Sequence, residues 1–126
     1  MERERENTMR AAFAEFAAVR RQARQAPAGT DAESGLLRRA HAIRGRCLHE
    51  LVDPRWGFEW SYLDSAYHDW RREPDSMRRF LGVLEEERAR GGDGGLTAIQ
   101  LRSQQQARDL VEAERTHSRT WPQRSR

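Results

Sequence analysis

The residue types that most often carry out chemistry in proteins are sparse in this chain of 126 residues. Of its four histidines and one cysteine, three residues lie near one another in sequence: His41, Cys47 and His49. Their spacing does not match that of zinc ligands, and no second cysteine pair exists. No nucleophile-elbow motif accompanies the serines, and the glycines at 91–95 lack the lysine and preceding strand of a phosphate-binding loop. We therefore predict no catalytic site, no bound metal and no cofactor.

A second pattern consists of His41, the adjacent pair His68 and Asp69, and Asp109, in that order. It resembles the H…HD…D pattern of HD-type phosphohydrolases, which are all-helical metal enzymes. The resemblance covers four positions and no flanking residues, so it implies an HD-like metal phosphohydrolase only as a remote alternative. The competing interpretation is a surface pair between His68 and Asp64, which lies four residues earlier.

Arginine is the strongest feature of the composition. All 23 basic residues are arginines, against 20 acidic residues, which gives a net charge of +3 and a pI of about 9.9. A GC-rich genome favours arginine codons, which is one explanation. The other is selection for a planar side chain that binds phosphate with two hydrogen bonds and stacks on bases.

The excess of positive charge lies in two segments. Residues 10–26 contain four arginines and one acid, and residues 97–126 contain six arginines and three acids. If two such helices are neighbours, they form a groove that follows a phosphate backbone. Ordinary solvated helix faces are the alternative. The candidate nucleic-acid-binding residues are Arg10, Arg20, Arg21, Arg24, Arg38, Arg39, Arg108, Arg115 and Arg119.

Hydrophobic periodicity predicts five helices and no strand, at about residues 8–26, 30–52, 53–72, 75–90 and 97–117. The second and fifth begin with capping boxes formed by Thr30 with Glu33 and by Thr97 with Gln100. Asp53, followed by a proline, can cap the third helix.

The sequence also predicts where order is lost. Residues 1–7 and 119–126 are expected to fray, and the glycines at 91–95 to form a flexible linker before the last helix.

The third helix carries a ladder of large apolar side chains within about a quarter-turn: Trp56, Trp60, Leu63, Tyr67 and Trp70. A platform that stacks bases needs cations beside it, but residues 53–73 contain five acids and only three arginines. We therefore predict that these rings form a core. The expected fold is a single all-α domain over residues 1–126, a compact bundle of about five helices with an aromatic core.

Helical wheels also assign faces to the other helices. In the second helix Leu37 and Leu51 are expected to face inward, and Phe80 in the fourth. In the fifth, Ile99 and Leu110 are the expected large inward groups. Opposite them, on an outer strip, we expect Gln105, Arg108, Glu112, Arg115 and Arg119. On the fourth helix an ion pair between Asp75 and Arg79 is expected.

Three further residues are candidates for contact with a partner. Phe58 and Tyr62 point away from the aromatic stripe of the third helix. Arg44 lies inside the apolar stripe of the second helix. A buried pair with an acid of the third helix is the favoured interpretation for Arg44, with snorkelling or a partner contact as alternatives.

These features predict a non-catalytic accessory subunit that binds the backbone of RNA or single-stranded DNA within a larger assembly. In size, helical make-up and arginine-studded surface the chain resembles the small subunits of CRISPR effector complexes. Those are short helical bundles that line up along the guide–target channel. The resemblance is architectural, so no functional residue follows from it; it implies a larger protein complex, copies of this chain, or both as partners. The alternative is a protein-interaction or structural helical bundle of a phage or plasmid system.

No segment is predicted to span a membrane, because the longest weakly polar run, residues 11–19, is interrupted by Glu15. The first ten residues are too charged for a secretory signal. The lone Cys47 cannot form an internal disulfide. We therefore expect a cytoplasmic protein.

Overall fold

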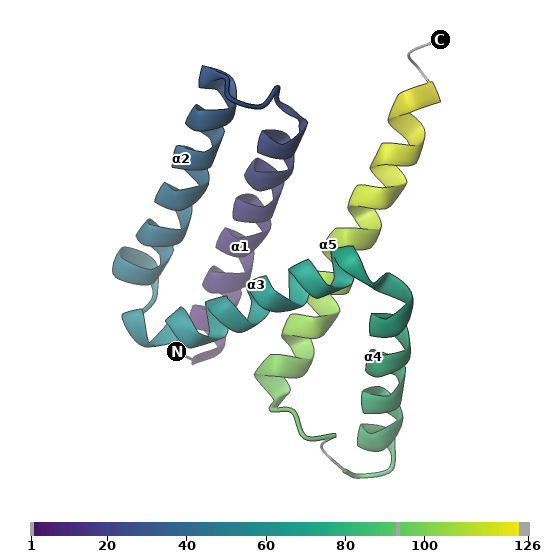
Figure 1. Cartoon of the computed structure of the whole chain (residues 1–126). Helices are drawn as coiled ribbons and strands as arrows, with labels where there is room; N and C mark the ends of the chain where they lie inside the picture. The colour runs from purple at the N-terminus through teal and green to yellow at the C-terminus, as the bar shows by residue number, and fades with distance from the viewer. Residues whose placement is uncertain (1, 93, 124–126) are drawn as a thin grey trace. The chain divides into compact units, whose positions relative to one another are not determined.

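The chain folds into α-helices throughout the part that the structure describes. The computed structural model describes residues 2–92 and 94–123, and for residues 117–123 only the backbone. Within these ranges there is no strand, and the five α-helices are α1 (Glu2–Gln25), α2 (Asp31–Arg46), α3 (Gly57–Arg72), α4 (Pro74–Ala89) and α5 (Ala98–Gln123) (Figure 1). The predicted all-α class with five helices is confirmed.

The chain divides into two compact units, residues 1–60 and residues 61–126, where the sequence predicted a single domain. The division falls inside α3, between Trp60 and Ser61. Trp60 therefore belongs to the core of the first unit, and Tyr67 and Trp70 belong to that of the second. All the rings of the predicted ladder are buried, none more than 8% exposed. They form core, as predicted, but they serve two units.

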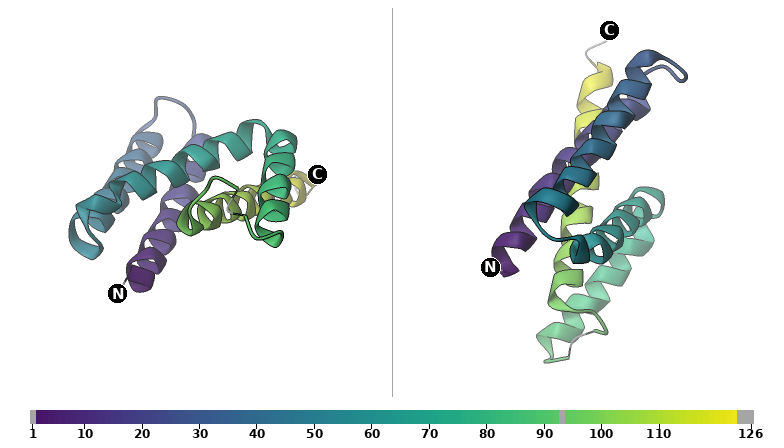
Figure 2. Two further views of the ribbon diagram at one scale, coloured as in Figure 1. Left: turned by 90° about the horizontal axis from the view of Figure 1, so that it is seen from below. Right: turned by 90° about the vertical axis from the view of Figure 1, so that its left-hand side faces the viewer.

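In the first unit α1 and α2 form an antiparallel hairpin (Figures 1 and 2). Trp60 packs edge-on against two rings of α1, with ring centroids 5.2 Å from Phe13 and 5.1 Å from Phe16. Edge-to-face packing of this kind stabilises a core beyond the burial of apolar area. The inward side chains of α1 form one stripe, and Met9, Phe13, Phe16, Val19 and Ala23 are all buried.

α1 begins at Glu2, and the fraying expected for residues 1–7 stays a prediction. Two acids in its first turn, Glu2 and Glu4, complement the positive end of the helix dipole. Glu6 is buried and pairs with Arg10, one turn later. These interactions stabilise the first turn even though it carries few apolar side chains.

The end of α2 explains why Leu51 does not face inward. After Arg46 the chain continues as a π-helix, η1 (Cys47–Leu51), in which the Val52 amide donates to the Cys47 carbonyl at 2.9 Å. The wider turn shifts the register of the residues within it. As a result Cys47 and Leu48 are buried, whereas Leu51 is 47% exposed. Leu37, on the flank of α2, is also exposed.

The predicted helix starts are formed by the expected side chains. The Thr97 hydroxyl accepts from the Gln100 amide and the Gln100 side chain accepts from the Thr97 amide, both at 3.1 Å. Asp53 caps the 3₁₀-helix η2 (Pro54–Trp56) that leads into α3. Hydrogen bonds from the side chain and the backbone of Arg55 lower the pKa of Asp53 to about 2.

In the second unit the inward face of α5 is rotated from the predicted one. Ile99 and Leu110 are only half-buried, and the buried residues of α5 are Ser103, Gln104, Ala107 and Val111. Gln104 explains the rotation, because its side-chain carbonyl accepts from Trp70 Nε1 at 2.9 Å and its amide donates to the Tyr62 hydroxyl at 3.0 Å. Satisfying a buried indole outweighs burying one more aliphatic side chain.

The turn between α4 and α5 is in contact with α4. The amide of Gly92 donates to the Glu87 carbonyl at 2.9 Å. Gly94 has φ +65°, and a Cβ placed there would lie 2.8 Å from Leu84 Cδ2. Asp93 lies outside the described residues, and the flexibility expected for residues 91–95 stays a prediction.

The close approach of Gly94 to Leu84 generates a stability test with a matched control. Gly94→Ala must adopt a positive φ and also displace the Leu84 side chain. Gly95→Ala has only the strain of a positive φ, because its φ is +82° and no atom lies within 4 Å of its Cβ position. We expect Gly95→Ala to lower the free energy of unfolding by about 1 kcal/mol and Gly94→Ala by about 1 kcal/mol more. Urea unfolding measures both. Equal losses would show that the contact with Leu84 carries no cost.

Candidate nucleic-acid interface

Arg10 lies in a buried ion pair, so the structure corrects its predicted place on an open face. Its Nε and Nη2 atoms lie 2.9 and 2.7 Å from Oε2 of Glu6. The Arg10 side chain is only 15% exposed and that of Glu6 only 4%. A charge-assisted pair at this depth is part of the core, because separating it would leave a buried charge unpaired.

Glu59 completes this acidic cluster in the first unit. Burial raises the pKa of Glu59, the charge of Arg10 lowers it, and the charge of Glu6 raises it again. Its Oε1 atom is buried and has no hydrogen-bond partner among the described residues. The i, i+4 spacing of Glu6 and Arg10 beside Met9 and Phe13 is the signal in the sequence that could have revealed this cluster.

Arg108 also differs from its prediction, because it faces α4 instead of the open side of α5. Its Nη1 lies 4.0 Å from Glu85, and its Nε donates to Asp109 at 3.0 Å. Gln105, expected beside it on the outer strip, donates to Glu85 at 3.2 Å. Three of the side chains expected on the outer strip, Gln105, Arg108 and Glu112, therefore bridge α5 to α4, and Arg108 is already neutralised.

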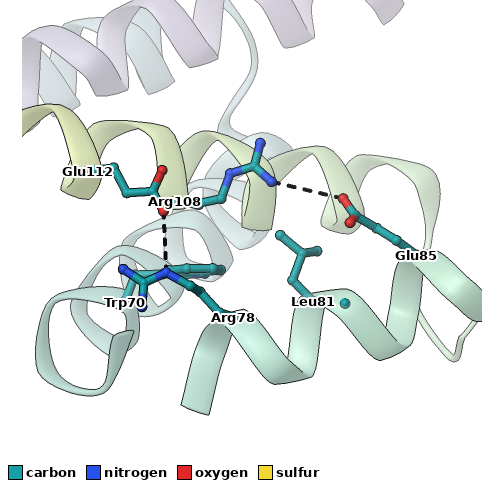
Figure 3. Close-up of a pocket in the computed structure, with 7 residues that line it drawn as sticks. Trp70, Arg78, Leu81, Glu85, Arg108 and Glu112 are labelled. Carbon is teal, nitrogen blue, oxygen red and sulfur yellow. Dashed lines mark ion pairs between the residues drawn. The ribbon is translucent and has the colours of Figure 1, made fainter. Parts of the chain in front are cut away.

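These bridges border a pocket of about 250 Å³ in the second unit (Figure 3). Its floor is apolar and includes Trp70 and Leu81. Arg78 lies 3.6 Å from Glu112 on one side, and Arg108 faces Glu85 on the other. Because two arginines and two glutamates alternate around it, the pocket has no net charge and no means of attracting an anion.

The α4 ion pair takes a different partner from the predicted one. Arg78, not Arg79, binds Asp75, with Nη1 2.6 Å from Oδ1. Arg79 donates to Ser76 at 3.3 Å instead. The i, i+3 position places Arg78 between Asp75 on its own helix and Glu112 on α5, so it satisfies two acids at once.

The α1–α2 hairpin carries a local excess of positive charge. Residues 16–49 contain seven arginines and two acids, a net charge of +5, and their two acids lie together at 31 and 33. In the antiparallel hairpin the end of α1 and the start of α2 lie side by side (Figures 1 and 2). This brings five of the predicted residues to the turn half of the hairpin: Arg20, Arg21, Arg24, Arg38 and Arg39. We call this set the hairpin arginines.

Of the hairpin arginines, Arg24, Arg38 and Arg39 are exposed, and Arg20 and Arg21 are half-buried. Arg39 lies 3.8 Å from Glu15, but both side chains are about 60% exposed. Such a pair contributes little free energy and exchanges easily for a phosphate. Arg38 is exposed beside Gly35, and the guanidinium of Arg20 lies 5.5 Å above the ring of Phe16. The five surround the turn half of the hairpin on several faces instead of forming a single line.

The other predicted site residues differ in how exposed they are and in what they contact. Arg115 is exposed on α5, and the side chain of Arg119 lies outside the described residues. Phe58 is 69% exposed, as expected for a residue that points away from the core. Tyr62 is half-buried and binds Gln104, so its hydroxyl makes an internal contact. Arg44 is half-exposed, and no described carboxylate lies within 4.0 Å of it, which corrects the expected buried pair.

The structure does not bring His41, Cys47, His49 and His68 together as a metal site. Among the described residues no group of three or more His, Cys, Asp or Glu side chains is placed to hold a metal ion. His68 Nε2 lies 3.6 Å from Asp64 Oδ1, as the surface-pair interpretation predicted. Burial raises the pKa of the Cys47 thiol, which favours its unreactive protonated form.

Comparison of the chain with protein-family models, curated proteins and solved structures finds no match. In the part of the chain that the structure describes, every helix is too short or too polar to cross a bilayer.

The raised pKa of Glu59 predicts how stability depends on pH. Because folding raises this pKa, Glu59 binds its proton more tightly in the folded state than in the unfolded state. The stability that results at low pH is lost as the pH rises through the folded-state pKa. Glu59→Gln should therefore raise the free energy of unfolding at pH 7 by about 0.5 kcal/mol, a small gain because the carboxyl is partly solvated. The gain should disappear below about pH 4.

Thermal unfolding of wild type and variant across this pH range measures the effect. Glu50→Gln, whose carboxylate is 70% exposed, is the matched control and should show little difference at any pH. A Glu59→Gln variant that is less stable than wild type at pH 7 would contradict the assignment.

Proposed function

We propose that the hairpin arginines bind the sugar–phosphate backbone of single-stranded nucleic acid, RNA or DNA, without reading its sequence. The chain would then act as a non-catalytic accessory subunit of a larger complex. The observation that carries this proposal is the net charge of +3 in residues 16–40, the turn half of the hairpin, where Arg24, Arg38 and Arg39 are exposed and Arg20 and Arg21 are half-buried. Guanidinium groups bind phosphates with two hydrogen bonds, and their binding releases counterions from the polymer.

The burial of the aromatic residues restricts the mode of binding. Proteins that hold single strands by stacking present several rings beside their cations. Here Trp56, Trp60, Tyr67 and Trp70 are buried, and the exposed phenylalanine rings among the described side chains are Phe58, in the first unit, and Phe80, in the second. Contacts to phosphates, which position a protein without specifying sequence, are therefore the favoured mode.

The resemblance to the small subunits of CRISPR effector complexes suggests a ribonucleoprotein as the larger assembly. It rests on size, helical content and exposed arginines. A reducing, cytoplasmic setting suits a chain whose single thiol, on Cys47, is buried and unpaired with another cysteine.

A protein-interaction bundle is the second candidate. The observation that favours it is the exposure of large apolar side chains in the first unit: Leu37 at 44%, Leu51 at 47% and Phe58 at 69%. Clustered exposed apolar groups mark protein interfaces, although single ones are common on any surface. In this case the arginines would only solvate the hairpin. Binding to nucleic acid distinguishes the two candidates.

Two Arg–Arg pairs allow a charge-matched test. Arg38→Gln/Arg39→Gln and Arg71→Gln/Arg72→Gln each remove two positive charges, the first from the hairpin and the second from the end of α3. We expect wild type to bind a labelled single-stranded oligonucleotide with an affinity that falls steeply with salt. The hairpin variant should bind about tenfold more weakly and should lose about 1.4 from the slope of log K against log salt. The α3 variant should stay within about threefold of wild type.

Fluorescence anisotropy across a salt series gives affinities and slopes, and circular dichroism confirms that both variants fold. Equal losses in the two variants would show that only overall charge matters and would refute a hairpin site. If wild type does not bind RNA or DNA at low salt, the nucleic-acid proposal fails and the second candidate stands.

A further inference from the structure

α4 has an apolar strip that no described residue covers. Phe80 is 41% exposed and Val83 is 59% exposed, and they are the two exposed large hydrophobic residues of the second unit within the described part. They lie three residues apart, so their side chains share one face of the helix. The opposite face holds the buried Leu81 and, at its edge, Leu84. Phe80 was expected to face inward, and this exposure corrects that expectation.

The residues around this strip follow the spacing of a helix–helix seam. Alternate steps of three and four, counted from Glu73 just before α4, pass through Phe80 and Val83 and end at Arg90 just after it. The seam positions are Glu73, Ser76, Phe80, Val83, Glu87 and Arg90. Its centre is apolar, its N-terminal end begins with an acid and its C-terminal end finishes with a base.

We propose that α4 pairs antiparallel with α4 of a second copy of this chain, about a two-fold axis between Phe80 and Val83. In this register each seam residue faces the seam residue that lies equally far on the other side of the axis. Phe80 therefore packs on Val83 of the other copy. Glu73 then faces Arg90, and Ser76 faces Glu87. Every contact occurs twice, which is the self-complementarity that a two-fold interface requires.

The flanks of the seam are complementary in the same register. In antiparallel pairs the flanking positions of one helix meet the same positions of the other. On one flank Arg79 meets Glu86 of the second copy. A parallel pair would instead place Glu87 against Glu87 and Arg90 against Arg90. Charge therefore selects the antiparallel arrangement.

The existing contacts of these charged residues are weak enough to exchange. Arg90 lies 3.8 Å from both Glu86 and Glu87, and its side chain is 70% exposed. Arg79 donates one hydrogen bond of 3.3 Å to the Ser76 hydroxyl. Surface pairs of this kind contribute little within one chain.

A single helix pair buries less area than a standard interface, so we expect a dimer with a micromolar or weaker dissociation constant.

Charge reversal tests this proposal, which does not depend on the proposed function. Arg79→Glu alone places like charges opposite Glu86 on both sides of the axis, and Glu86→Arg alone places like charges opposite Arg79. Each variant should dimerise at least about tenfold more weakly than wild type. An equimolar mixture of the two variants restores opposite charges at all four positions. The mixture should therefore form a heterodimer of near wild-type affinity.

Sedimentation equilibrium from about 10 µM to 1 mM covers the expected dissociation constants. The mixture also controls for misfolding, because two variants that merely unfold would not rescue each other. Wild type that is monomeric over this whole range would overturn the proposal, whatever else covers the strip. A mixture that associates no better than either variant alone would also overturn it.

Discussion

The aromatic residues of α3 can be buried only where their polar atoms find partners or where other rings enclose them. In the second unit Gln104 meets this requirement, because one amide side chain accepts from Trp70 and donates to Tyr62. In the first unit the requirement is met only in part. Trp60 packs on Phe13 and Phe16, and its Nε1 atom has no hydrogen-bond partner among the described residues. An unpaired buried N–H costs about 1–3 kcal/mol, which the packing of three rings must offset.

The burial of these rings restricts where the arginine side chains can lie. Because the rings of α3 occupy the interior, the arginines are divided between two roles. Arg10 and Arg108 bind carboxylates beside the cores, and the hairpin arginines stay accessible to solvent. The pocket between α4 and α5 shows the first role clearly, since its alternating arginines and glutamates join the two helices and cancel each other (Figure 3). A count of arginines therefore overstates the cationic surface, and among the described side chains the hairpin keeps a clear local excess.

The sequence predicted the features that depend on local chemistry. Five helices, the capping box at Thr97 and the buried face of α3 follow from spacing and from side-chain type, and the structure confirms them. It did not predict features that depend on a partner distant in sequence. The inward turn of Gln104 requires an indole 34 residues earlier, and the place of Arg108 requires Glu85. A helical wheel assigns polar residues to the outside, so it errs wherever a buried ring needs an acceptor.

The most direct test of the account follows the indole and arginine N–H signals by NMR while a single-stranded oligonucleotide is added. The account predicts that the Nε signals of Arg38 and Arg39 shift, while the indole signals of Trp56, Trp60 and Trp70 stay in place. Shifted indole signals with unmoved hairpin arginines would contradict it, because the rings would then be stacking on bases and not forming the core.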